Sequence, residues 1–148
     1  HAEALRGLDV HLRIIGEPSD ADHSMLKQLG VEYSTQSKLT DAEMQEAYAT
    51  SDFLLFASTL EGFGMPILEA QMVGLPVITS HIAPMNEVAG DGALLCDPLD
   101  SKAIRGCIER VTSNAQLREN LIQKGADNCK RFSPEESARM LHQLYKEM

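Results

Sequence analysis

Long apolar runs, basic surface and paired cysteines are all scarce in this 148-residue sequence. Charged residues or prolines interrupt every window of about 18 residues, so we expect no membrane-spanning helix. The first residues, HAEALRGLDVHLR, mix charged and apolar side chains from the start, unlike a secretory signal peptide. The formal net charge of −9 leaves little basic surface for a phosphate backbone, and we expect no nucleic-acid partner.

Cysteine occurs three times, as Cys96, Cys107 and Cys129, and no two form a Cys-x-x-Cys pair. An odd number at these spacings disfavours a disulfide framework and a zinc site, and it favours reduced thiols in a cytoplasmic protein. The five histidines are scattered, without the paired spacing of metal-binding helices. We therefore predict no metal site.

What the sequence does contain is typical of one globular domain. Hydrophobic residues make up 43% and charged residues 24% of a chain long enough to bury a single core. No internal repeat, low-complexity tract or linker interrupts it. We predict one domain over residues 1–148.

Short apolar runs alternate with helical patterns along the chain. The predicted strands cover residues 10–15, 31–33, 52–57, 76–79 and 93–96. In the run at 52–57, every residue after Asp52 is apolar, which is typical of a strand buried on both faces. The predicted helices cover residues 20–29, 40–50, 66–74 and most of the chain after Pro98. This alternation predicts an α/β domain, a Rossmann-like parallel sheet flanked by helices, with further helices at the C-terminus.

Several helix starts carry recognisable capping residues. Thr40 and Glu43 have the spacing of a capping box, as do Ser133 and Glu136. Two further residues, Asp100 and Asn114, are candidate N-caps.

Two glutamates, Glu61 and Glu69, flank a glycine turn in the stretch STLEGFGMPILEA. In doubly wound sheets, ligands bind beyond the carboxyl ends of the strands, and this stretch follows a predicted strand. Gly62 and Gly64 lack Cβ atoms, so backbone N–H groups can approach a ligand there. The helix that follows offers free N–H groups and a partial positive charge to a phosphate. Glu69, expected in about the first helical turn, would be ionised and could accept the two hydroxyls of a ribose. Glu61 would face the crevice.

Each of these features also has a simpler interpretation. A glutamate in a first helical turn often only complements the helix dipole, and a Gly-x-Gly turn is often structural. The combination is more specific, and it suits a phosphorylated ligand that carries sugar hydroxyls.

The run EGFGMPILEAQMVGLPVITS resembles the signature of the retaining family-4 glycosyltransferases of the GT-B fold. It contains their E-x7-E pair as Glu61 and Glu69, their glycine turn, and their A-x3-G-x-P-V run from Ala70 to Val77. The resemblance continues in LRIIGEP, SKLTDAEMQEAYATSDFLLFAS, EVAGDGALLCDP and RFSPEESARMLHQLY. It covers nearly the whole chain.

This resemblance implies the C-terminal, donor-binding half of an enzyme that transfers a glycosyl group from a nucleotide diphosphate sugar to a hydroxyl acceptor with retained configuration. Glu61, the catalytic candidate, would hold hydroxyls of the transferred sugar, and Glu69 would hold the ribose. The nucleotide sugar is the donor substrate, and no cofactor is implied. The other donor-binding candidates are Gly62, Phe63, Gly64, Met65, Gly16, Glu17, Ser37, Lys38 and Leu39.

Within this set, the N–H groups around Phe63–Met65 would contact sugar and diphosphate. Ser37–Leu39 would lie against the nucleobase, and Gly16 and Glu17 would line the phosphate side. The alternative for Ser37–Leu39 is an ordinary loop ahead of a helix, and for Lys38 a solvated side chain.

The resemblance is incomplete at its start. The family begins this domain with a strand and a loop carrying an arginine and a lysine, and Arg6 does not stand in that context. The family order of six strands, 3-2-1-4-5-6, would leave a gap between the strands near Val10 and Phe53. An open gap inside an apolar sheet is costly, so the chain would either pair these two strands directly or borrow a strand from a neighbouring molecule, and we expect it to self-associate. Without the basic pair, we expect the isolated chain to be inactive. The half that would bind an acceptor glycan or lipid-linked sugar is also missing. The parent enzyme would be cytoplasmic or peripheral to a membrane.

The alternative function is a non-catalytic nucleotide-binding or assembly module, such as an NAD domain. NAD binding would need G-x-G-x-x-G after the first strand, with an acidic residue about twenty positions later. The turn here reads GEPSDA, with proline in place of the second glycine. The nucleobase, the sugar and the acceptor stay open.

Overall fold

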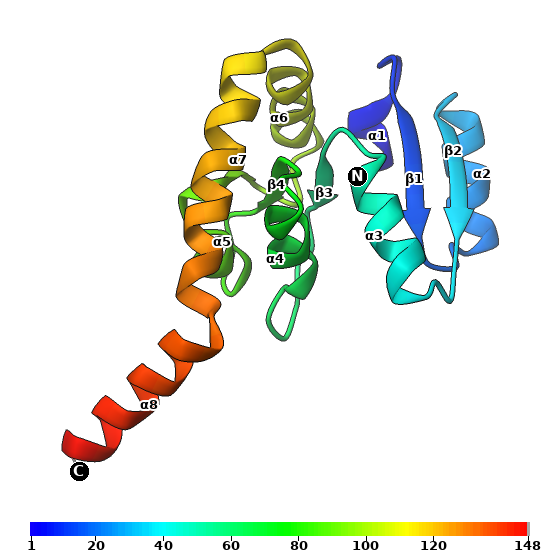
Figure 1. Cartoon of the computed structure of the whole chain (residues 1–148). Coiled ribbons are helices and arrows are strands. Elements are labelled where there is room, and N and C mark those ends of the chain that lie inside the picture. Colours follow the sequence, from blue (N-terminus) through cyan, green and yellow to red (C-terminus); the bar gives the residue numbers. More distant parts are fainter. Residues whose placement is uncertain (148) are drawn as a thin grey trace.

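The chain folds into parallel strands that alternate with helices, as a computed structural model of residues 1–147 shows (Figure 1). The strands are β1 (His11–Ile15), β2 (Glu32–Gln36), β3 (Leu54–Phe56), β4 (Val77–Ser80) and β5 (Ala93–Cys96). The helices are α1 (Ala2–Leu5), α2 (Asp20–Gln28), α3 (Asp41–Ala49), α4 (Met65–Met72), α5 (Met85–Ala89), α6 (Ser101–Ser113), α7 (Ala115–Cys129) and α8 (Pro134–Glu147). Two 3₁₀ turns are η1 (Gly90–Gly92) and η2 (Lys130–Phe132). The predicted α/β class with parallel strands is confirmed.

The strands form two separate sheets. In the first, β1 and β2 run parallel, with His11 beside Glu32 and Ile15 beside Gln36. In the second, β4 lies between β3 and β5. Among the strands of residues 1–147, β1 pairs with β2 alone and β3 with β4 alone. A gap therefore separates β1 from β3, and the direct pairing of these strands, one of the two expected ways to close it, does not occur.

Burial along β3 differs from the prediction. Leu54, Leu55 and Phe56 are all only half-buried, whereas every residue of β4 is buried. The two strands differ because β4 has a neighbour on each side, while the second edge of β3 faces the gap. The prediction that this strand is buried on both faces is wrong for that reason.

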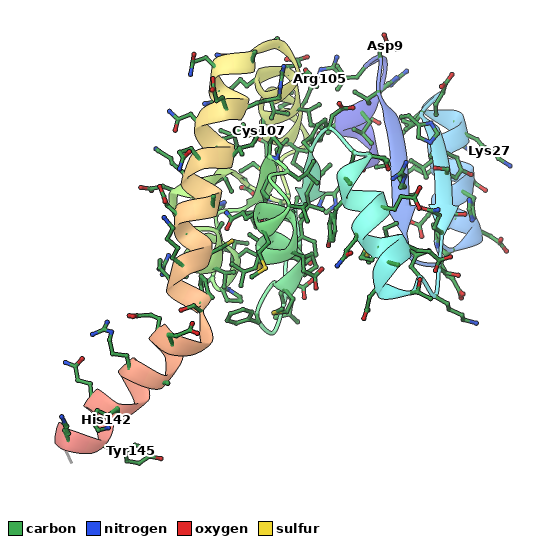
Figure 2. All side chains as sticks on the ribbon, viewed as in Figure 1. Asp9, Lys27, Arg105, Cys107, His142 and Tyr145 are labelled. Carbon is green, nitrogen blue, oxygen red and sulfur yellow. The ribbon has the colours of Figure 1, made fainter. Side chains whose placement is uncertain are left out.

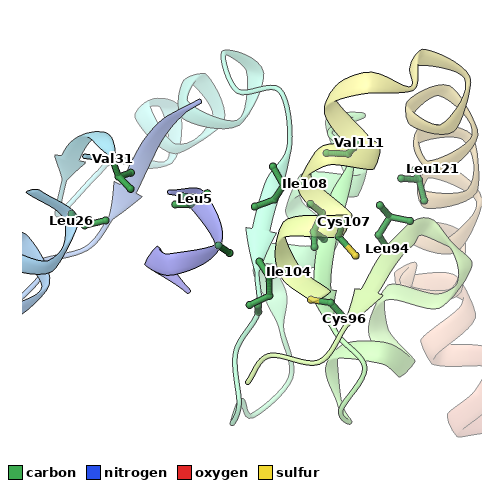
Figure 3. Packing of buried hydrophobic residues seen from close by; sticks show 13 residues of the cluster. Leu5, Leu26, Val31, Leu94, Cys96, Ile104, Cys107, Ile108, Val111 and Leu121 are labelled. Carbon is green, nitrogen blue, oxygen red and sulfur yellow. The ribbon is translucent and has the colours of Figure 1, made fainter. Parts of the chain in front are cut away.

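The apolar core has two parts. One cluster joins α1, α6 and the sheet faces beside them, and it includes Leu94, Ile104 and Ile108 (Figure 3). The other lies under α4 and α5 and includes Ile67 and Val77. By contrast, α8 extends away from the body, and its labelled residues in Figure 2 lie far from both clusters.

Capping residues define where the helices begin. The Glu43 N–H donates to Thr40 Oγ1 over 3.3 Å, and the Thr40 N–H donates to the Glu43 carboxylate over 2.7 Å. The predicted capping box at α3 is confirmed. Ser19 and Asp22 form a second, unpredicted box at α2.

Two of the later caps follow the sequence, since Asp100 caps α6 and Asn114 caps α7, as predicted. The predicted box at Ser133 is only half formed. The Glu136 N–H donates to Ser133 Oγ over 3.1 Å, but the Ser133 N–H bonds to the Lys130 carbonyl and the Glu136 carboxylate pairs with Arg139. None of the helices described is both long and apolar enough to cross a membrane.

Candidate functional site

The loop from Ala57 to Gly64 leaves the carboxyl end of β3 and leads into α4. Two side chains of the neighbouring strand hold its start. Thr79 Oγ1 donates to the carbonyl oxygen of Phe56 over 2.8 Å, and Ser80 Oγ donates to that of Ser58. Both hydroxyl residues are fully buried in β4. The loop is therefore anchored to the centre of the sheet.

Glu61 lies half-buried within this loop. Ser58 Oγ donates to its Oε1 over 2.8 Å, which orients the carboxylate. An ionised carboxylate offers about four acceptor positions, so one such bond leaves capacity for ligand hydroxyls.

Glu69 contacts a different helix. Tyr48, near the end of α3, donates its hydroxyl to Glu69 Oε2 over 2.8 Å. Burial is the main cause that raises the pKa of Tyr48, and the hydrogen bond to Glu69 and the negative charge of Glu69 raise it further. The phenol therefore stays a neutral donor at neutral pH. Because α4 begins at Met65, Glu69 lies in the second helical turn and not in the first, where it was expected.

The two glycines of the loop have different roles. Gly64 is the N-cap of α4 with φ of +102°, and a Cβ there would lie 3.2 Å from Ile67 Cδ1. The backbone angle favours glycine at this position, and a Cβ would also crowd the Ile67 side chain. A Cβ at Gly62 would meet no atom within 4 Å, so its absence leaves the loop surface open.

The start of α4 leaves backbone donors free. No side chain caps this helix, Pro66 has no N–H, and the Ile67 N–H bonds to the Gly64 carbonyl over 3.0 Å. Among the described residues, Gly64 and Met65 therefore supply the unpaired N–H groups of this terminus. Negative charge is stabilised at such a position.

Phe63 and Met65 are both exposed on this loop. The ring of Phe63 meets that of Phe132 edge-on, with the centroids 5.9 Å apart. This contact ties the tip of the loop to η2.

The other predicted site residues lie at the ends of β1 and β2. Gly16 follows β1 and donates its N–H to the carbonyl of Gln36 over 2.8 Å, and Glu17 beside it is exposed. Ser37 and Lys38 are exposed after β2, and Leu39 is half-buried. Lys38 has φ of +54°, a left-handed conformation that is uncommon for lysine.

The structure thus divides the predicted residues into two groups. One surrounds the start of α4 and contains both glutamates, and the other lies on the β1–β2 sheet. All strands within each sheet are parallel, so each group lies at a carboxyl edge.

Sequence reasoning missed the residues that hold the two glutamates. Tyr48 stands 21 positions from Glu69 in an ordinary helical stretch, where no motif marks it. Ser58 lies three residues before Glu61 within STLEGFGMPILEA, and a serine at that spacing is not part of any motif that assigns it a role. In residues 1–147, no cluster of three or more histidine, cysteine, aspartate or glutamate residues could hold a metal ion.

Comparison with known proteins adds independent information. Residues 2–128 match the family model described as glycosyl transferases group 1. The chain is 35% identical over 106 residues to O-antigen chain mannosyltransferase B of Escherichia coli. That alignment covers 72% of the chain and 28% of the relative, so the chain spans well under half of that enzyme.

Solved structures of other proteins have a similar fold. The match to sucrose-phosphate synthase of Thermosynechococcus elongatus covers 99% of this chain and 40% of the synthase chain. Its TM-score is 0.84 at 19% sequence identity. Another match is the C-terminal domain of a glycosyl transferase group 1 family protein of Francisella tularensis. It covers 87% of this chain and 75% of the solved domain. Its TM-score is 0.73 at 26% identity.

Proposed function

Because the chain belongs to the glycosyl transferases group 1 family and has GT-B glycosyltransferases as structural neighbours, we propose that it is the donor-binding half of such an enzyme. In this proposal it binds a nucleotide diphosphate sugar. The parent enzyme, a retaining family-4 glycosyltransferase, moves the glycosyl group to a hydroxyl of an acceptor glycan or lipid-linked sugar.

The observation that supports the proposal most strongly is the arrangement of hydrogen-bond acceptors and donors around α4. Glu61 and Glu69 are carboxylates held in place by Ser58 and Tyr48, and unpaired N–H groups lie at the helix start between them in sequence. Carboxylates accept bonds from sugar hydroxyls, while the N–H groups at a helix N-terminus suit phosphate. A ligand with hydroxyls and phosphates together satisfies the whole set.

Each residue then has a defined task. Glu69 accepts from the ribose hydroxyls, and Glu61 accepts from hydroxyls of the transferred sugar. The N–H groups around Phe63–Met65, beside the open surface at Gly62, contact the sugar and the diphosphate.

The residues of the β1–β2 sheet complete the donor site. Gly16 and Glu17 line the phosphate side, and Ser37–Leu39 lie against the nucleobase. The left-handed backbone of Lys38 supports this role, because such conformations concentrate at ligand-binding positions.

The chemistry needs no cofactor, metal or side-chain base from this chain. The bond between the sugar carbon and the diphosphate oxygen breaks, and a bond forms from that carbon to the acceptor oxygen on the same face. The acceptor proton passes to the leaving phosphate. The chain contributes by stabilising the charge that develops on the diphosphate.

A binding panel tests this proposal. Thermal unfolding is followed with UDP, GDP, ADP and NAD⁺ at equal concentrations. One of the three nucleoside diphosphates should raise the melting temperature, since a ligand at about 100 times its Kd stabilises the folded state by about 2.7 kcal/mol. Stabilisation by NAD⁺ alone would contradict the proposal and favour the dinucleotide alternative.

A further inference from the structure

Helix α3 connects the two groups of proposed donor-binding residues. It begins at Asp41, directly after Ser37–Leu39 and the cap residue Thr40, so its first end borders the group on the β1–β2 sheet. Near its other end, Tyr48 donates its hydroxyl to Glu69 Oε2 over 2.8 Å. The placement of α3 therefore affects where the Glu69 carboxylate lies relative to the first group.

Few apolar contacts hold this helix in place. Of its nine residues, Ala47 alone is buried, while Met44 and Tyr48 are half-buried and the rest are exposed. Helices in proteins owe most of their stability to the packing of an apolar face. The position of α3 must therefore depend strongly on its polar contacts.

Arg13 of β1 makes a polar contact at the carboxyl end of α3. Its Nη1 atom donates to the carbonyl oxygen of Ala47 over 2.9 Å and to Thr50 Oγ1 over 2.8 Å. The Thr50 hydroxyl donates in turn to the carbonyl oxygen of Glu46 over 2.7 Å, so it accepts from Arg13 with a lone pair. Both acceptors thus belong to the last turn of the helix or to its C-cap.

The charge of Arg13 also suits this position. Helix α3 has acidic residues in its first turn and no basic residue in its last turn. A cation is stabilised by the partial negative charge at a helix C-terminus. Arg13 is half-buried on a strand that pairs with β2 along its length, so a fixed element supplies the guanidinium. The β1–β2 sheet therefore holds the end of α3 that contains Tyr48.

We propose that Arg13 is a positioning residue of the donor site: by holding the end of α3, it keeps the Tyr48 hydroxyl against Glu69 and so orients this carboxylate for the ribose. The inference rests on the proposed function, in which Glu69 accepts from the ribose hydroxyls. Figure 1 shows α3 between β1, which contains Arg13, and α4, which contains Glu69.

Orientation before binding affects affinity because a mobile carboxylate must lose rotational freedom when a ligand binds. Without the bonds from Arg13, the end of α3 can shift, and Glu69 then loses the hydroxyl that orients it. Affinity for the ribose hydroxyls should fall, while the contacts to the rest of the nucleotide should not change.

Matched nucleotides isolate this effect. Binding of UDP, GDP and ADP, and of their 2′,3′-dideoxy forms, is measured by calorimetric titration of the 148-residue chain. The two forms of each nucleotide differ only in the hydroxyls that Glu69 is proposed to bind. The ratio of their dissociation constants, for each base that binds, therefore reports the contact between Glu69 and the ribose.

Two arginine variants are compared. Arg13→Met removes the donors and keeps an unbranched apolar stem. Arg118→Met is the matched control, because Arg118 Nη1 donates to the carbonyl oxygens of Val111 and Thr112 over 2.8 and 3.0 Å. Each variant thus loses two similar bonds at the end of a helix, α3 in the first case and α6 in the second.

We expect the unsubstituted chain to bind the ribose form more tightly than the dideoxy form by about tenfold or more. Arg13→Met should reduce this ratio by about threefold or more, whereas Arg118→Met should leave the ratio unchanged while it lowers the melting temperature. Tyr48→Phe should reduce the ratio to the same extent as Arg13→Met. The double variant should show no further reduction, because both substitutions act on one contact.

The possible failures are distinguishable. An unchanged ratio in Arg13→Met, or an equal reduction in Arg118→Met, would overturn the positioning role and leave the proposed function intact. If the unsubstituted chain binds both forms equally, or binds no nucleotide, the ribose role of Glu69 is wrong and this inference with it.

A milder variant covers the case in which Arg13→Met does not fold. Thr50→Val keeps the shape of the side chain and removes one acceptor of the Arg13 guanidinium. A smaller ratio with Thr50→Val than with the unsubstituted chain supports the proposal, and an unchanged ratio contradicts it.

Discussion

At the scale of single residues, the proposed site depends on two carboxylates that are oriented by hydroxyl groups. Tyr48 holds Glu69 from another helix, and Ser58 holds Glu61 from within the loop. The two glutamates therefore have separate supports, and substitutions at one should not disturb the other.

Replacing the two glutamates should separate their roles in the parent enzyme. Glu69→Ala should weaken binding of the free nucleotide diphosphate by about 1.5–3 kcal/mol, because a charged acceptor for ribose is lost. Glu61→Ala should leave that binding intact and impair binding of the nucleotide sugar. Calorimetric titration of each variant with both ligands measures the difference, and equal losses in both variants would contradict the assigned roles.

Tyr48 should make stability depend on alkaline pH. Its pKa is raised above the ordinary value of 10.0, mainly by burial, so the folded state holds the phenol proton more tightly than the unfolded state. The resulting stability is fully present below pH 10 and is lost as the pH rises above it. Tyr48→Phe removes this dependence. Free energies of unfolding at several pH values check it, and identical alkaline slopes for both proteins would refute it.

The sequence predicts residues of the site better when their partners are near in the chain. The loop from Glu61 to Met65 leads from a strand into a helix as predicted, because glycine and proline constrain the backbone locally. The bond from Tyr48 to Glu69 depends on how α3 packs beside α4, which no local pattern encodes.

At the scale of elements, α7 packs unusually close to η1. A Cβ at Gly92 would lie 2.6 Å from the Cα of Gly125 in α7 and 2.5 Å from the Gln71 amide. Gln71 in turn accepts a bond from Asn128 over 2.8 Å, and both residues are buried. The missing side chain at Gly92 therefore lets η1 pack directly against α7 and the Gln71 side chain.

Alanine substitutions at two glycines should have opposite effects. Gly92→Ala should destabilise the fold by about 1–3 kcal/mol, because backbone must move to admit the methyl group. Gly106→Ala is the matched control inside α6, where a Cβ meets no atom within 4 Å. It should stabilise the fold by about 0.5–1 kcal/mol, since alanine favours the helix. Denaturant unfolding of both variants measures the contrast, and a neutral Gly92→Ala would contradict this account.

Elements were predicted well where their signals are local. The capping box at Thr40 and the caps at Asp100 and Asn114 are confirmed, because each involves residues within three positions. The burial of β3 was predicted wrongly because it depends on which strands lie beside it. Apolar composition shows that a strand can be buried, whereas the strands that pair with it determine how far it is buried.

At the scale of the whole molecule, the isolated chain should not transfer sugar at a useful rate. Effective catalysis requires two substrates held in one geometry, and this chain supplies the proposed donor side alone. A coupled assay for released nucleotide diphosphate, with several nucleotide sugars and acceptors, measures the rate. Robust turnover would show that acceptor binding lies within these residues.

The isolated chain should also self-associate. The gap between β1 and β3 presents unpaired strand edges and half-buried apolar side chains on both sides, and such edges pair readily between molecules. Light scattering over a range of concentrations should show a mass that rises with concentration. A constant monomer mass with a high melting temperature would mean that the open edges are tolerated.

The hydroxyl bonds from Thr79 and Ser80 to the loop after β3 have a consequence for the speed of recognition. A segment that is fixed before a ligand arrives needs no slow search for its bound shape. For the proposed nucleotide sugar, we therefore expect encounter, and not rearrangement, to limit how fast the complex forms, so that the observed rate constant should grow in proportion to ligand concentration without reaching a plateau. Differences in affinity between related donors should consequently arise in how long each one stays bound.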